Sequence, residues 1–275
     1  MNASELALYL AALDLAPEPP SLSFLQRLVA GHVARFPFGN LGVLLERPLP
    51  LDSASIFDRI VRKHQGGYCY EQNGLFQEVL SALGFEVDAR LARVVYAYDD
   101  PFASPGMTHR FNVVDLDGQR WVTDVGFSHM GPAAPVPLTG KSVSPRGMRA
   151  VALREQDWHL QRPLGDAWHS LYRFADKAVV DADIEMGHFW SSCHPTALFR
   201  NVLAASRILT DRTVSIRNLS LVDAPFDGAA QVTDIGAPEQ LREALHERFD
   251  IALSHTESQR LFETIYSLTS TSPRR

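Results

Sequence analysis

The sequence has few cysteines, no dense basic run and no long apolar run, and each absence argues against a class of protein. Only two of the 275 residues are cysteine, too few for a disulfide framework, and no Cys/His spacing of the zinc-binding kind occurs. The net charge is −6, whereas a nucleic-acid surface needs a basic patch. No apolar run reaches the roughly 18 residues of a membrane span. We therefore expect no metal, no nucleic-acid partner and no membrane partner.

The N-terminal segment, MNASELALYLAALDLAPEPP, does not resemble a signal peptide, because it lacks a basic start and carries Glu5 and Asp14. Together with the low cysteine count, this predicts a reduced, cytoplasmic setting. Apolar residues make up 45% of the chain and charged residues 21%, which is typical of a globular protein with material for a core.

The periodicity of apolar residues changes along the chain. The first third has helical spacing, as in SLSFLQRLVAGHVARF (21–36) and in the segment after Cys69, which ends near Gly84. From about residue 86 the period becomes two, as in EVDARLARVVYAY and RFNVVDLDGQRWVTDVGF. The last third mixes both patterns. Helices, then strands, then a mixed segment indicate an α+β fold rather than a repeating βαβ sheet.

Cys69 stands in the segment KHQGGYCYEQNGLF (63–76), after two glycines and at the start of a predicted helix. The glycines permit a close-approaching backbone. The unpaired N–H groups and the dipole of a helix N-terminus stabilise an anion, so a thiolate there is a better nucleophile. A small buried apolar cysteine explains the position equally well.

A nucleophilic thiol needs a base, and the base needs an orienting group. Asp117-Gly118 predicts a tight hairpin in which opposed residue numbers sum to 235, so Phe111 faces Asp124. His109 is then on the same face as Phe111 and diagonal to Asp124, about 7–8 Å away between backbones. This register permits an Asp-oriented imidazole, although a surface His and a surface Asp would give the same pattern.

With Cys69, His109 and Asp124 in this order, the chain resembles the arylamine N-acetyltransferases. GGYCYEQNGLF is similar to the nucleophile motif of that family, THRFNVV to its histidine segment and WVTDVGF to its aspartate segment. HVARFPFGNLGVLLERP and FWSSCHPTALF resemble two further family segments. The matches span residues 32 to 199.

The resemblance implies a three-part fold and a catalytic triad of Cys69, His109 and Asp124. A helical bundle (1–85) would carry the cysteine, a β-barrel (86–190) the histidine and aspartate, and an α/β lid (191–275) would close the chain. The implied reaction is ping-pong transfer of acetyl from acetyl-coenzyme A, through a Cys69 thioester, to an arylamine, arylhydroxylamine or hydrazine. The protein would be a monomer or a homodimer.

The resemblance also implies binding residues. Phe38, Tyr70 and Phe199 match positions that line the pocket of the family, and Phe127 and His129 are expected to contact substrate. Gly126 and Ser128 are expected to contact the coenzyme. Ordinary core packing explains each aromatic residue as well.

The sequence departs from the family pattern at three places. Gln65 replaces an Arg and Gly39 replaces a Glu; if these two residues pair in the family, losing both avoids a stranded buried ion. Ser128, His129 and Met130 stand where small glycines are common, which leaves the preferred acyl donor or acceptor open. Alternatives are therefore an amide synthase that uses a larger acyl chain, a cysteine hydrolase with the same triad, and a non-catalytic binding module.

Overall fold

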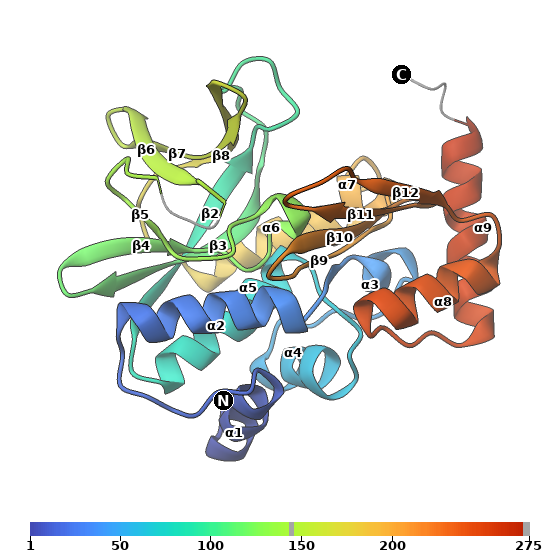
Figure 1. The fold of residues 1–275 in the computed structure, drawn as a ribbon, viewed down its shortest axis with the longest axis horizontal. Coiled ribbons are helices and arrows are strands. Elements are labelled where there is room, and N and C mark those ends of the chain that lie inside the picture. The colour runs from blue at the N-terminus through green and yellow to red at the C-terminus, as the bar shows by residue number, and fades with distance from the viewer. Residues whose placement is uncertain (143–145, 272–275) are drawn as a thin grey trace.

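The N-terminal helices pack around one apolar core, in a computed structural model that describes residues 1–142 and 146–271 (Figure 1). Ser21 caps α2 and Asp52 caps α4, each accepting a backbone N–H through its side-chain oxygen. The core joins Leu28 and Val29 of α2 to Phe76 and Val79 of α5. These elements are α1 (Ala3–Ala12), α2 (Leu22–Arg35), α4 (Ser53–Phe57), the π-helical turn η1 (Asp58–Arg62) and α5 (Cys69–Ala82).

Helix α5 begins at Cys69 because the side chain of Glu71, in its first turn, caps the backbone of the preceding residue, Tyr68. The carboxylate of Glu71 accepts the N–H of Tyr68 at 3.0 Å, as in a capping box. The helix is followed by Gly84, whose φ of 84° is the left-handed conformation that glycine adopts without a steric penalty. The helix start and the C-terminal glycine are both as the sequence predicts.

Within residues 1–142 and 146–271, seven strands form a nearly closed antiparallel barrel in the order β5-β4-β3-β2-β8-β7-β6. A bridge between Leu138 and Ala150 connects the two outer strands. The β3–β4 hairpin turns at Asp117 and Gly118, both with positive φ, and opposes Asn112 to Thr123, so the predicted register is confirmed. The strands are β2 (Glu86–Val94), β3 (Met107–Leu116), β4 (Gln119–Thr123), β5 (Val136–Pro137), β6 (Arg149–Arg154), β7 (Asp157–Leu164) and β8 (Ala167–Phe174).

A second sheet, of five strands in the described part of the chain, has the order β1-β9-β10-β11-β12. Two helices, α8 (Pro238–Phe249) and α9 (His255–Thr271), pack on it through Val214, Ile216, Leu245 and Leu261. Its first strand comes from the N-terminal part, since Phe38 and Gly39 pair with Ser206 and Ala205. The strands are β1 (Phe38–Gly39), β9 (Ala204–Ile208), β10 (Arg212–Arg217), β11 (Ser220–Pro225) and β12 (Gln231–Asp234).

Helix α6 (Asp181–Cys193) packs on β3 of the barrel and on α7 (Leu198–Asn201), and the sequence patterns did not predict it. Its apolar residues do not follow a buried stripe, because Met186, Phe189 and Trp190 are exposed while Ile184 and Ser191 are buried. The helix crosses the boundary expected at residue 190, so the three-part division remains a proposal. The short helices α3 (Leu41–Leu44) and α7 (Leu198–Asn201) and the 3₁₀ turn η2 (Ser128–Met130) complete the elements. None of the helices described is long and apolar enough to cross a membrane.

Candidate active site

Cys69 is the first residue of α5 and is 2% exposed. The two glycines before Cys69 bring the chain close to the backbone of β1. Gly66 has a φ of 69°, and the carbonyl of Gly67 accepts the N–H of Gly39 at 2.8 Å. The Cys69 sulfur lies 3.7 Å from the carbonyl oxygen of Thr108. Thr108 is presented there by an irregularity in the β2–β3 pairing, where Ala92 opposes His109 but Arg93 opposes Met107. Local sequence rules do not reveal this bulge.

His109 and Asp124 are in direct contact beside the cysteine. His109 Nε2 and Asp124 Oδ2 are 2.7 Å apart, and both side chains are almost completely buried. The contact follows from the hairpin register, since Asp124 comes directly after β4 and His109 lies on β3. With Nε2 engaged by the carboxylate, Nδ1 is the ring nitrogen left to face the thiol.

His109 and Asp124 each stabilise the charged form of the other. Burial opposes a charged imidazole, but the Asp124 carboxylate, aided by Cys69, outweighs it and raises the pKa of His109 to about 10. Burial also opposes ionisation of Asp124, yet His109, the Asn73 amide and the Gly126 N–H hold the pKa of that carboxyl below its usual value. An imidazolium at neutral pH is therefore the favoured state, and it is available to pair with a thiolate.

Asn73 connects α5 to Asp124. Its Nδ2 donates to Asp124 Oδ1 at 3.0 Å and to the Arg110 carbonyl at 2.7 Å. Its Oδ1 accepts the N–H of Val125 at 3.0 Å. Since Asn73 lies one helical turn beyond Cys69, this side chain sets the position of the carboxylate relative to the cysteine.

A cavity of about 320 Å³ opens in front of Cys69 and His109. Six of the residues expected to bind substrate or coenzyme line it: Phe38, Gly126, Phe127, Ser128, His129 and Phe199. The sequence patterns did not single out Tyr96, Tyr98, Trp190, Leu198 and Arg217, which also line the wall. They come from the loop after β2 and from α6, α7 and β10, and sequence spacing does not show that these elements meet.

Tyr70 does not line this cavity, which differs from the expectation. Successive residues of a helix point about 100° apart, so Tyr70 faces away from the side that Cys69 presents. Its ring is completely buried against Tyr68 and His188. A Cβ added at Gly187 of α6 would lie 2.1 Å from the Tyr70 hydroxyl oxygen, so α6 packs directly on this side chain.

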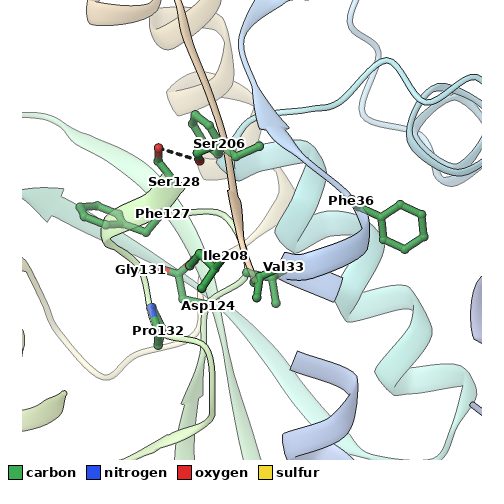
Figure 2. Close-up of a pocket in the computed structure, with 11 residues that line it drawn as sticks. Val33, Phe36, Asp124, Phe127, Ser128, Gly131, Pro132, Ser206 and Ile208 are labelled. Carbon is green, nitrogen blue, oxygen red and sulfur yellow. Dashed lines mark hydrogen bonds between the residues drawn. The ribbon is translucent and has the colours of Figure 1, made fainter. Parts of the chain in front are cut away.

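The loop after Asp124 is held to the second sheet. Ser128 has a φ of 56°, and its Oγ lies 2.9 Å from the Oγ of Ser206 on β9 (Figure 2). The void below this contact, beside Asp124, measures only about 10 Å³, which is room for about one water. The larger space beside this loop is therefore the cavity on its Cys69 side.

Gly39 and Gln65, the first two departures from the family pattern, lie near the side chain of Ile251. Cβ atoms added at Gly39 and at Gly66, next to Gln65, would lie 3.9 Å and 3.4 Å from Ile251 Cδ1.

In the described residues, no group of three or more His, Cys, Asp and Glu could hold a metal.

The sequence model of a family described as N-acetyltransferase matches residues 21–258. The arylamine N-acetyltransferase of Escherichia coli is 39% identical over 193 residues, which cover 70% of this chain and 68% of that protein. The chain belongs to the arylamine N-acetyltransferase family. The protein is therefore an acyltransferase.

Solved arylamine N-acetyltransferases have the same fold. The enzyme from Salmonella typhimurium aligns with a TM-score of 0.89 at 28% identity, over 97% of this chain and 100% of that chain. The enzyme from Mycobacterium marinum in complex with CoA aligns with a TM-score of 0.87 at 28% identity, over 94% and 99% of the two chains. The α+β architecture expected for a family member is confirmed.

Proposed function

We propose that the protein transfers acetyl from acetyl-coenzyme A to an arylamine, arylhydroxylamine or hydrazine, through an acetyl-thioester on Cys69. The observation that carries this proposal is that Cys69 and His109 line one cavity while Asp124 holds the imidazole from behind at 2.7 Å. That arrangement is the nucleophile, base and orienting group that acyl transfer through a thiol requires.

In the first half-reaction, the thiolate of Cys69 attacks the thioester carbon and a new C–S bond forms. The bond to the coenzyme sulfur breaks, and the imidazolium of His109 gives that sulfur its proton. In the second half-reaction, the acceptor nitrogen attacks the acetyl-Cys69 thioester and loses a proton to His109, and the thiolate is released. Asp124 keeps the imidazole in one orientation through both halves.

The aromatic side chains that line the cavity favour an acceptor with an aromatic ring. Phe38 and Phe199 pack with ring centroids 5.9 Å apart, and the Phe127 ring meets the His109 imidazole edge-on at 4.9 Å. Flat apolar walls bind a flat ring, and the polar groups near Cys69 orient its nitrogen. Modification of foreign amines is the corresponding role, in a cytoplasmic protein that is a monomer or a homodimer.

The test is the intact mass of the protein after brief incubation with acetyl-coenzyme A, before and after addition of an aromatic hydrazine. We expect a gain of one acetyl group on the wild type and on Cys193→Ser, no gain on Cys69→Ser, and complete discharge by the hydrazine. Cys193→Ser is a matched control because Cys193 is exposed and lies outside the cavity lining.

The alternatives predict other outcomes. An adduct that is lost as quickly without an amine as with it would identify a hydrolase. An adduct that forms only from longer acyl thioesters would identify an enzyme that uses a larger acyl chain. No adduct from any thioester on folded protein would contradict the proposal.

A further inference from the structure

Three arginines from separate segments lie around His129, which lines the catalytic cavity, near enough for their charges to act on its imidazole. Arg217 ends β10 and lines the cavity together with His129. Arg162 lies on β7 of the barrel. Arg146 precedes β6, and its neighbour Gly147 packs on β7, since a Cβ there would lie 3.4 Å from Pro163 Cγ. The Arg146 guanidinium also lies over the Phe226 ring, 5.7 Å from its centre, so it bridges the barrel and the second sheet.

In the part of the chain that the structure describes, these three arginines differ from most others because no carboxylate lies within ion-pair distance of them. Arg35, Arg120, Arg173 and Arg212 each form an ion pair with an aspartate. Within the described residues, the side chains of Arg146, Arg162 and Arg217 form no ion pair and no hydrogen bond, and Nη1 of Arg146 is buried without a partner. Arg146 and Arg162 are partly buried, and Arg217 is exposed. A partly buried cation without a counter-charge is destabilised by desolvation, so a bound anion would stabilise this place.

The field of this cluster reaches the cavity. Burial and the charges of Arg146, Arg162 and Arg217 together lower the pKa of His129 to about 4. Burial, then the charge of Arg162, lowers the pKa of Arg146 to about 10. The positive potential therefore extends inward from the barrel edge to His129.

We propose that Arg146, Arg162 and Arg217 bind the phosphate groups of the acyl donor while its thioester lies at Cys69. This rests on the proposed function, because it takes the donor to be a coenzyme A thioester. Only Arg217 of the three lines the cavity, so a single carboxylate on an acceptor inside it would meet one arginine. Coenzyme A carries its diphosphate and 3′-phosphate at the far end of a flexible arm, and several arginines outside the cavity match such a multiply charged group.

The test compares acetyl-coenzyme A with S-acetyl-N-acetylcysteamine, a thioester without phosphate. For Arg146→Gln, Arg162→Gln and Arg217→Gln, we measure the rate of Cys69 acetylation by intact mass at low and high salt. The matched control is Arg149→Gln, which removes the same charge three residues from Arg146. Arg149 lies over Trp168 and donates to Gln161, and it does not line the cavity.

We expect each of the three substitutions to slow acetylation by acetyl-coenzyme A about tenfold at low salt, and less at high salt, because salt screens the attraction. With the phosphate-free thioester the rates should stay within about twofold of the wild type, as should Arg149→Gln with either donor. Binding of coenzyme A to Cys69→Ser protein, measured by calorimetry, should weaken by a similar factor with each arginine substitution.

Three results would overturn the inference. Equal losses with both donors would assign the arginines to the fold rather than to phosphate. Unchanged rates and unchanged coenzyme A binding would remove the site altogether. A rise in KM for 4-aminobenzoate, with the donor unaffected, would assign the cluster to an acceptor carboxylate. The calorimetry separates the two proposals, because it reports on phosphate binding even if no acetyl-enzyme forms.

Discussion

Asn73 Nδ2 donates a hydrogen bond to Asp124 Oδ1, and this contact joins the helix that carries Cys69 to the hairpin that carries His109. The two residues are 51 positions apart in the sequence and both are buried. The geometry of the site therefore depends on an amide that is not hydrogen-bonded to the thiol and does not line the cavity.

Replacing Asn73 by Asp should harm acetylation more than replacing it by Ala, although Asp preserves the size of the side chain. Asp substitutes an acceptor for the donor that faces Asp124, so two carboxylates would repel each other. We expect Asn73→Asp to lower kcat about a hundredfold, because small displacements of catalytic groups are costly. The KM for acetyl-coenzyme A should change little. Near wild-type activity in Asn73→Asp would contradict this role.

Replacing Asp124 by Asn should leave His109 neutral at pH 7. The carboxylate keeps the pKa of His109 at about 10, and without it burial dominates and lowers that pKa. Histidine NMR titration of the wild type and of Asp124→Asn measures the difference. An identical His109 titration in both proteins would sink the prediction.

The same shift predicts how stability depends on pH. The folded-state pKa of His109 is raised above its ordinary value of 6.5, so its contribution is fully present below about pH 6.5 and is lost as the pH rises toward 10. The free energy of unfolding of the wild type should therefore fall between pH 7 and pH 10 by more than that of Asp124→Asn. Urea titrations at several pH values provide the measurement.

Gly126→Ala should disrupt the site, because a Cβ there would lie 2.6 Å from Asn73 Nδ2 and 2.8 Å from Cys69 Cα. We expect a loss of about 1–3 kcal/mol in the free energy of unfolding and a strong loss of activity. Gly106→Ala is the matched control, since its Cβ would meet Thr108 Cγ2 at an ordinary 3.4 Å. Equal thermal stability of the two variants would contradict the close packing described.

Gly187→Ala should destabilise the protein mainly by displacing the Tyr70 hydroxyl. In a Tyr70→Phe background the same change should therefore cost less, by about 1 kcal/mol, as expected for residues in contact. Tyr70→Phe alone should leave the KM for arylamines unchanged, because Tyr70 does not line the cavity. Additive effects in this double-mutant cycle would show that the contact with Tyr70 is not the cause.

Gln65→Arg should destabilise the protein, whereas Gln65→Leu should not. An Arg at position 65 would have no Glu partner at position 39. The apolar side chain of Ile251 lies beside Gly39 and beside Gly66, the residue after Gln65. We expect a cost of about 1–3 kcal/mol, measured by chemical denaturation. If Gln65→Arg is as stable as the wild type, the idea that the two charges were lost together is wrong.

Sequence patterns predict the parts of this structure that depend on residues close together in the chain, such as turns and helix ends. The Asp117-Gly118 turn sets the strand register and thereby brings His109 to Asp124, and the glycines and the Glu71 capping residue mark the start of α5. Where distant segments meet, the sequence gives no local signal. The Asn73–Asp124 contact, the direction of Tyr70 and the gathering of Arg146, Arg162 and Arg217 all depend on tertiary packing.

Strand β1 has a consequence for synthesis of the protein on the ribosome. Phe38 and Gly39 pair with β9 on one side and bridge to Gly67 on the other, so β1 joins the backbone that leads to Cys69 to the edge of the C-terminal sheet. In a nascent chain the surroundings of the thiol therefore stay incomplete until residues 204–208 have emerged. A chain whose synthesis stops before that point lacks β9, so β1 has no partner strand on that side and the surroundings of Cys69 are incomplete.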